Sequence, residues 1–233
     1  MDYTLRGQTY KLCGILNGTD YDKKDFNPKL KPGFKAEVQK MFGLPQNPDR
    51  PLIAMISRLV YQNGLSLVDF AKFDLMNLPA DFVFLGTGEY GFENMLIWVS
   101  NNSSNMRAWI DFKADLSQTI YKGADMFLMP SLFEPCGISQ MIAMKYGTVP
   151  IVRAVGGLDD TVISYPNEKA NGFKFLTYDA RSMVDEIKNA VWTYIDRRDE
   201  FNKIVKNAIA SKFTWEESAV KYKLLYLDAL GRK

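Results

Sequence analysis

The chain has 233 residues, of which 47% are hydrophobic, and a formal net charge of +2. The apolar content supports a sizeable core, and the charge balance argues against a nucleic-acid-binding protein, which usually carries a dense basic patch. With two cysteines and no histidine, the sequence predicts no disulfide framework, no histidine base and no protein-held metal, and it favours a reducing compartment. No apolar run reaches the roughly 18 residues needed to span a bilayer.

The predicted elements alternate between helices and strands along most of the chain. The strongest strands are apolar on both faces, as buried parallel strands are. Strands are predicted at residues 52–57, 82–85, 106–110, 126–129, 149–152 and 173–175. Helices are predicted at residues 35–42, 65–73, 92–99, 116–121, 138–146, 159–163, 183–194 and 201–209. This alternation predicts an α/β fold with a doubly wound, mostly parallel, Rossmann-like sheet.

The stretch of the sequence that is most informative about function runs from a buried strand through a turn into a helix. Pro130 ends the strand, because proline has no N–H to give to a ladder. Glu134 lies in the turn, and Gly137 precedes a helical pattern that stops at Gly147. Ligands bind at the carboxyl ends of parallel strands, and anions bind helix N–H groups, so this turn is a candidate ligand site.

The residues of this stretch are more specific than the pattern. PSLFEPCGISQ (130–140), followed by KYGTVPIVRAVGGLDDTV (145–162), resembles the bacterial glycogen synthase and plant starch synthase family. That family has the GT-B architecture, in which two Rossmann-like domains face each other across a cleft. It moves glucose from ADP-glucose or UDP-glucose to the non-reducing end of an α-1,4-glucan with retention. The resemblance implies that this chain is the C-terminal, nucleotide-sugar-binding half of such an enzyme.

The resemblance also implies a domain organisation. Residues 1–27 contain GILNGTD (14–20), which in the family lies at the crossing from the first domain to the second. Residues 28–212 are expected to form the Rossmann-like domain, and residues 213–233 a helix that crosses back to an N-terminal domain absent from this chain. Thr214 and Glu217 have the spacing of a capping box at the start of that helix. We expect the purified chain alone not to transfer glucose, and measured turnover would contradict this.

Two positions of the resembled family supply cations to the donor diphosphate. The arginine position is Arg58, at the end of the strand over 52–57, where its guanidinium could grip phosphate oxygens in pairs. The lysine position is Asn63, whose amide donates a hydrogen bond but carries no charge. Losing one electrostatic donor typically costs about 10²–10³ in rate. The protein is therefore a slow enzyme, an enzyme with a substituted cation, or an inactive relative.

The turn itself supplies the next candidates. Glu134 matches the family glutamate near the donor glucose, where it would accept hydrogen bonds from sugar hydroxyls; the alternative is a turn carboxylate that caps the next helix. The N–H groups of Ile138 and Ser139, with the Ser139 hydroxyl, are expected to bind the diphosphate. Cys136 is expected to pack beside the site, and Gly137 to open the helix.

Further candidates would shape the nucleotide pocket. Gly86 and Thr87 end a strand where a ligand could approach the backbone. Phe112 matches a position near the base that is usually tyrosine, so its ring could stack on adenine; a core role is the alternative. Gly157 could turn tightly beneath the sugar, or could belong to an ordinary strand-to-helix turn.

The expected partners are a nucleotide-sugar donor and an α-1,4-glucan acceptor bound through the absent domain. No cofactor, metal, nucleic acid or membrane is expected, and the expected location is the cytoplasm of a bacterium, with a plastid as the alternative. Two other functions stay open: a non-catalytic GT-B-like nucleotide-binding module, which Asn63 favours, and a GT-B glycosyltransferase with a different donor, which the EPCG turn disfavours. The sequence does not separate ADP-glucose from UDP-glucose.

Overall fold

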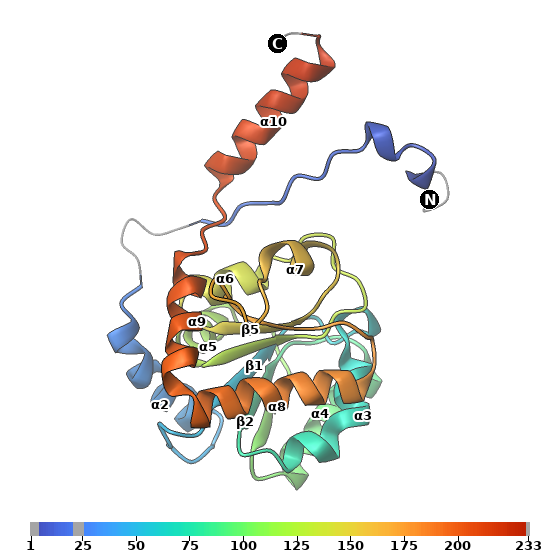
Figure 1. Cartoon of the computed structure of the whole chain (residues 1–233). Coiled ribbons are helices and arrows are strands. Elements are labelled where there is room, and N and C mark those ends of the chain that lie inside the picture. The colour runs from blue at the N-terminus through green and yellow to red at the C-terminus, as the bar shows by residue number, and fades with distance from the viewer. Residues whose placement is uncertain (1–4, 21–25, 232–233) are drawn as a thin grey trace. The chain divides into compact units, whose positions relative to one another are not determined.

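The computed structural model describes residues 5–20 and 26–231 and divides the chain into two compact units. The larger unit, Tyr21–Lys212, is built on a six-stranded sheet with helices on both faces (Figure 1). The strand order is β3-β2-β1-β4-β5-β6, and every neighbouring pair is parallel. The predicted doubly wound α/β sheet is therefore confirmed.

The elements follow the predicted alternation. The strands are β1 (Leu52–Ile56), β2 (Asp81–Leu85), β3 (Met106–Trp109), β4 (Met126–Met129), β5 (Val149–Arg153) and β6 (Phe173–Phe175). The helices of this unit are α2 (Lys31–Met41), α3 (Leu65–Met76), α4 (Tyr90–Asn102), α5 (Ala114–Gly123), α6 (Ser139–Lys145), α7 (Gly156–Thr161), α8 (Ala180–Asp196) and α9 (Arg198–Ala210). A 3₁₀ turn, η3 (Tyr61–Asn63), precedes α3. In the part of the chain that the structure describes, no helix is long and apolar enough to cross a membrane.

The core lies on both faces of the sheet, because successive side chains of a strand point to opposite sides. In β1, Leu52 and Ala54 belong to the cluster with α2, α5 and α6, whereas Ile53 and Met55 belong to the cluster with α3, α4 and α8. Fully burying one such large aliphatic side chain contributes about 1.5–3 kcal/mol. Two-sided burial explains why these strands are apolar throughout rather than alternating.

Most helices of this unit begin two to four residues earlier than the sequence predicted, and α2 and α7 show why. Helix α2 starts at Lys31 rather than at residue 35, because Pro32 lies in the first turn, where a missing N–H breaks no helical hydrogen bond. Helix α7 starts at Gly156 rather than at Asp159 and ends at Thr161. Its first two residues are glycines; Gly156 has a left-handed φ of +48°, and both glycines pack against the loop after β4, so tertiary contacts set this start.

The smaller unit joins residues of both chain ends, Met1–Asp20 and Phe213–Lys233. Its main element is α10 (Trp215–Ala229). The Thr214 hydroxyl accepts the N–H of Glu217 at 3.2 Å, which is one of the two bonds of the predicted capping box. The Ser218 hydroxyl donates to the carbonyl of Leu16 at 2.7 Å, so the two chain segments are hydrogen-bonded within this unit.

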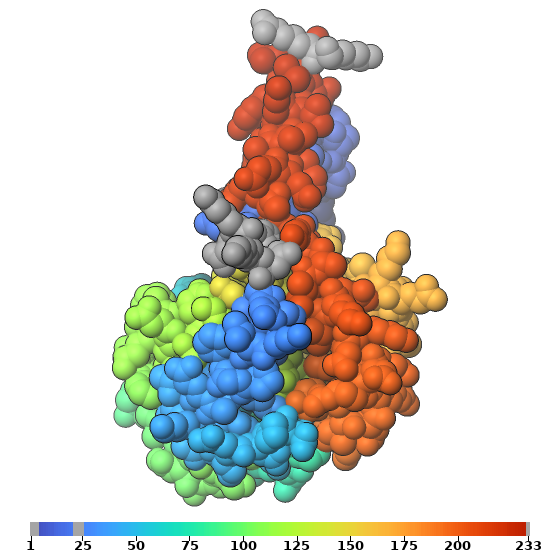
Figure 2. All heavy atoms as spheres, turned by 90° about the vertical axis from the view of Figure 1, so that its left-hand side faces the viewer, coloured from blue at the N-terminus to red at the C-terminus, as the bar shows by residue number. Residues whose placement is uncertain are grey.

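A buried ion pair lies at the amino ends of the strands of the larger unit. The Lys35 Nζ is 2.8 Å from the Asp125 Oδ2, and their side chains are only 5% and 11% exposed. Asp125 also accepts the N–H of Leu52 at 2.9 Å, and Lys35 donates to the Pro48 carbonyl and to the Tyr194 hydroxyl. The pair thereby ties α2 to β1 and to α8. The face that carries α2 (blue), α8 and α9 (orange) is shown in Figure 2.

Replacing the buried cation tests this role. We expect Lys35→Met to lower the free energy of unfolding by about 3–5 kcal/mol, because it leaves the Asp125 carboxylate buried without its charge partner. Urea denaturation measures the change. The matched control is Lys72→Met, which removes a more exposed 2.8 Å pair with Asp69 on α3 and should cost no more than about 1 kcal/mol. Equal small losses in both variants would contradict the assignment.

Candidate functional site

The loops that follow the strands meet at the carboxyl edge of the sheet. The order of the strands along the chain reverses between β1 and β4, and ligands of such sheets bind in the crevice at this switch point. Two cavities open there, of about 230 Å³ and about 310 Å³. Ile56, Ser57 and Arg58 line both, so the two cavities adjoin at the end of β1.

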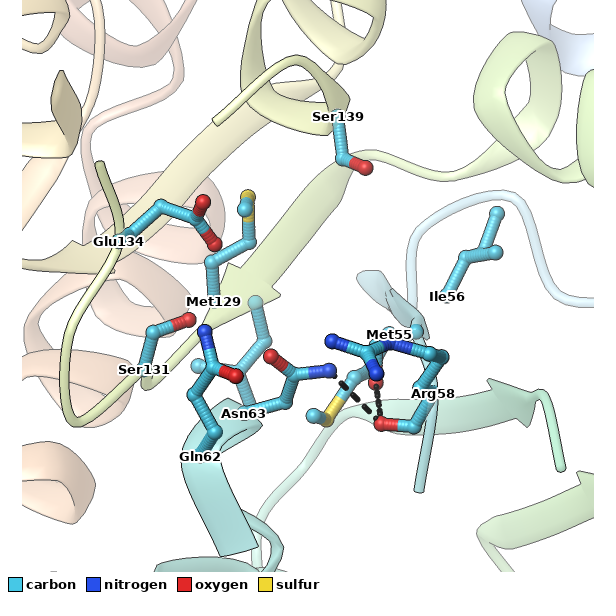
Figure 3. Close-up of a pocket in the computed structure, with 11 residues that line it drawn as sticks. Met55, Ile56, Arg58, Gln62, Asn63, Met129, Ser131, Glu134 and Ser139 are labelled. Atoms are coloured by element: carbon cyan, nitrogen blue, oxygen red, sulfur yellow. Dashed lines mark hydrogen bonds between the residues drawn. The ribbon is translucent and has the colours of Figure 1, made fainter. Parts of the chain in front are cut away.

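The smaller cavity gathers polar side chains from two segments, the loop after β1 and the loop after β4 with the first residue of α6. Figure 3 shows these side chains, which are Arg58, Gln62, Asn63, Ser131, Glu134 and Ser139. The structure thus brings together Arg58 and Glu134, which lie 76 positions apart in the sequence. Gln62 and Ser131 also line the cavity, and the sequence analysis did not single them out. Each follows a strand end by only a few residues, a position that could have identified them as candidates.

Asn63 is engaged with the main chain of the arginine loop. Its Nδ2 donates to the Arg58 carbonyl oxygen at 2.8 Å, a bond drawn in Figure 3. The next residue, Gly64, has φ +83° and packs against the end of β4, where an added Cβ would lie 2.1 Å from the Pro130 carbonyl oxygen. Asn63 therefore fixes the backbone that carries Arg58, while Gly64 lets this loop approach the loop after β4.

Glu134 is half-buried in the loop after β4. Burial raises the pKa of its carboxyl above the ordinary value of 4.5, and the Gly137 N–H and the Arg58 charge lower it by less. The bond from Gly137 agrees with the alternative of a turn carboxylate, yet the same carboxylate lines the cavity. The Glu134 carbonyl oxygen accepts the N–H of Gly157 at 3.1 Å, which fixes the loop from behind.

Ser139 is the first residue of α6 and lies beside a buried phenol. Burial raises the pKa of the Tyr121 phenol to about 12, and a hydrogen bond with the Ser139 side chain opposes this rise. Gln140 is fully buried, and its Nε2 donates to the carbonyl oxygens of Cys136 at 3.2 Å and Gly137 at 3.0 Å. These bonds hold the turn before α6, so the Ser139 hydroxyl is presented to the smaller cavity from a fixed backbone.

The larger cavity is lined by the loops after β2 and β3 and by α5. Phe112 is 85% exposed there, so its alternative role in the core is wrong: β3 ends at Trp109, and the ring lies beyond the sheet. Gly86 and Thr87 line the same cavity, and a Cβ on Gly86 would lie 1.9 Å from the Ser57 carbonyl oxygen. Gly86, Thr87 and Phe112, three of the predicted nucleotide-pocket residues, thus gather around one space.

Four predicted residues shape the loop after β4 instead of lining either cavity. They are Cys136, Gly137, Ile138 and Gly157. A Cβ on Gly157 would lie 2.0 Å from the Cys136 carbonyl oxygen, so this glycine lets the first turn of α7 pack on the loop. Lys113 and Tyr121 also line the larger cavity, although neither was predicted. Tyr121 lies within a helix, and a helical tyrosine carries no local signal of its tertiary position.

Comparison with known proteins identifies a family and several relatives of this chain. Residues 38–208 match the protein family described as "Glycosyl transferases group 1". The chain is 38% identical over 251 residues to "Glycogen synthase 1" of Geobacter metallireducens, with 100% of this chain and 50% of that relative covered. It is 41% identical over 246 residues to "Glycogen synthase" of Clostridioides difficile, with 98% and 51% covered.

Among solved structures, the chain is similar to the catalytic domain of starch synthase IV from Arabidopsis thaliana bound to ADP and acarbose. The TM-score is 0.87 at 32% identity, and the match covers 99% of this chain and 51% of that one. Anabaena HepE in complex with UDP and glucose shares the fold, with a TM-score of 0.65 at 17% identity over 86% of this chain and 54% of that one. The chain thus spans about half the length of the curated relatives it matches.

The raised pKa of Glu134 predicts a pH-dependent stability. Because the folded state holds this proton more tightly than the unfolded state, stability falls as pH rises from the unfolded pKa through the folded one. We expect Glu134→Gln, which lacks the charge, to be more stable than the wild type at pH 7 and equally stable below about pH 4. Denaturation curves across this range measure the difference. Glu37→Gln, on the exposed side of α2, is the control; the same trend there would contradict the assignment.

Proposed function

Because the chain belongs to the family of group 1 glycosyl transferases, we propose that it is the nucleotide-sugar-binding half of a retaining glucosyltransferase of glycogen or starch synthesis. The reaction moves glucose from ADP-glucose or UDP-glucose to the non-reducing end of an α-1,4-glucan. The relatives named glycogen synthase and the starch synthase structure that contains ADP support this proposal. The observation that carries it is the convergence of Arg58 and Glu134 on one cavity at the switch point of the sheet.

The proposed donor lies across both cavities, with its diphosphate at Arg58, which they share. Breaking the bond between the sugar and the diphosphate leaves negative charge on the diphosphate. A preorganised cation and neutral donors stabilise that charge most where water is excluded. Arg58 supplies the cation, and the Ser139 hydroxyl supplies a neutral donor beside it. The base then occupies the larger cavity, where the exposed ring of Phe112 offers a stacking surface.

The sugar occupies the inner part of the smaller cavity. Glu134 accepts hydrogen bonds from sugar hydroxyls, and Gln62 and Ser131 add groups that both donate and accept. Such contacts orient the ring with its anomeric carbon toward the acceptor. In this proposal Glu134 binds and orients the sugar, and the leaving phosphate helps to take the proton of the acceptor hydroxyl.

The glucan acceptor is proposed to bind through the part of the full-length enzyme that this chain does not include. The matched relatives are about twice as long as the chain, which supports a second domain facing the site. The bacterial sources of these relatives support the cytoplasm of a bacterium as the proposed location.

A non-catalytic nucleotide-binding module is the second candidate. Arg58 is the one cation among the described residues that line the smaller cavity, because Asn63 carries no charge. The Asn63 amide is moreover bonded to the Arg58 carbonyl oxygen. A site with one cation binds a diphosphate less strongly than a site with two, which is what a retained but inactive module would show.

Calorimetric titration with ADP and with UDP tests the nucleotide site on which both candidates depend. We expect the chain to bind at least one of these nucleotides. Asn63→Lys should tighten that binding about tenfold, equivalent to about 1.4 kcal/mol, because it adds a cation beside Arg58. The matched control is Asn77→Lys at the end of α3, where the Nδ2 likewise donates to a main-chain carbonyl, that of Phe73 at 2.7 Å. Asn77→Lys should not change the affinity.

The opposite outcome is equally informative. Absence of binding of both nucleotides in the wild type and in Asn63→Lys would contradict a nucleotide-sugar site in this chain. Equal tightening by Asn63→Lys and Asn77→Lys would show an effect of net charge alone, since both variants add one positive charge to the protein.

A further inference from the structure

Arg153, the last residue of β5, holds the loop that carries Glu134. Its Nη1 donates to the main-chain carbonyl oxygens of Leu132 at 2.6 Å and of Ser131 at 3.3 Å. Arg153 does not itself line either cavity at the carboxyl edge. It therefore acts on the site through the backbone of the loop after β4, which presents Ser131 and Glu134 to the smaller cavity.

The same guanidinium reaches toward the loop after β1. Its central carbon lies 5.4 Å from the centroid of the Tyr178 ring, and the Tyr178 ring meets the Tyr61 ring at 6.2 Å in an edge-on contact. The Tyr178 hydroxyl also bonds the Ser66 hydroxyl at 3.0 Å at the start of α3. Since Tyr61 begins the turn that carries Gln62, Arg153 and Tyr178 connect the loops on two sides of the smaller cavity.

The main chain completes this connection. The N–H of Leu132 donates to the Gln62 carbonyl oxygen at 2.8 Å, and the N–H of Gly157 donates to the Glu134 carbonyl oxygen at 3.1 Å. Arg153 binds the carbonyl side of the same Leu132. Among these contacts, Arg153 supplies the charged side chain, and hydrogen bonds from a charged donor are about twice as strong as neutral ones.

We propose that Arg153 is a positioning residue for the sugar part of the donor. It holds Ser131 and Glu134 opposite Gln62, so that their polar groups converge where the sugar binds. This inference rests on the proposed function for the identity of the ligand. Binding of the nucleotide part depends on other elements, because Arg58, Ser139 and Phe112 lie outside the segment that Arg153 bonds.

The test compares the affinities for a nucleoside diphosphate and for its glucose ester. Arg153→Met removes the guanidinium donors and keeps an unbranched apolar side chain. We expect it to bind ADP, or UDP if that binds more tightly, as the wild type does. We also expect it to lose about tenfold to a hundredfold in affinity for the corresponding glucose ester, since a displacement near 1 Å has effects of this size. Calorimetric titration measures both constants.

The matched control is Arg107→Met on β3. The Arg107 Nη1 also donates to two main-chain carbonyl oxygens, those of Ser103 at 2.6 Å and Met106 at 2.8 Å, but it lines neither cavity. We expect Arg107→Met to keep both affinities. An Arg153→Lys variant, which restores a charged donor without the planar fork, should recover part of the lost affinity.

A purely structural role of Arg153 predicts a different result. Arg153→Met would then weaken both ligands equally, or neither, and either result overturns the proposal. Amide hydrogen exchange gives a readout that needs no ligand: the amides of Leu132 and Gly157 should exchange faster in Arg153→Met and unchanged in Arg107→Met. If the wild type binds neither nucleotide, the proposed function fails. Hydrogen exchange still decides separately whether Arg153 holds the loop, and unchanged exchange in Arg153→Met overturns the proposal for Arg153.

Discussion

Main chain packs directly on main chain where the loop after β4 meets the first turn of α7, and the site depends on this contact. A Cβ on Gly156, which has φ +48°, would lie 2.1 Å from the Glu134 carbonyl oxygen, and one on Gly157 would lie 2.0 Å from that of Cys136. Real Cβ atoms do not approach backbone oxygens so closely, so any side chain at either position displaces the loop. Because the backbone of α7 packs directly against the Glu134 carbonyl, the Glu134 carboxylate can reach into the cavity.

Burial of Glu134 at this edge of the sheet destabilises the folded protein. Burial of Glu134 raises the pKa of its carboxyl, which means that the charged form is less stable in the folded protein than in water. Arg58 and the Gly137 N–H offset only part of this cost. A fold selected for stability alone would expose or neutralise such a group. This uncompensated desolvation of Glu134 is consistent with a carboxylate that is held for a ligand, since polar groups of a sugar would replace the lost water.

The fold was more predictable from the sequence than the site was. The strands could be predicted because they are buried on both faces and therefore apolar throughout, and the edge where ligands bind follows from a doubly wound sheet. The start of α2 was misplaced because Pro32 and Gly33 suggest a turn in isolation. Phe112 had two possible roles until the end of β3 placed it outside the sheet. Arg153 could not be predicted, because its role depends on carbonyl groups that only the tertiary structure brings near it.

Asn63 shows how a neutral side chain can serve a charged site. Its amide does not add to the positive potential of the cavity, but its bond to the Arg58 carbonyl oxygen at 2.8 Å fixes the residue that does. Lys113 also lines the larger cavity, yet its Nζ lies 3.8 Å from an Asp111 carboxylate oxygen, so its charge is partly compensated. The positive charge at the edge shared by the two cavities therefore comes mainly from Arg58. The Asn63 amide orients the backbone of Arg58 but adds no charge, whereas a lysine at position 63 would add a charge. Electrostatic stabilisation of an anion requires both an oriented group and a charge.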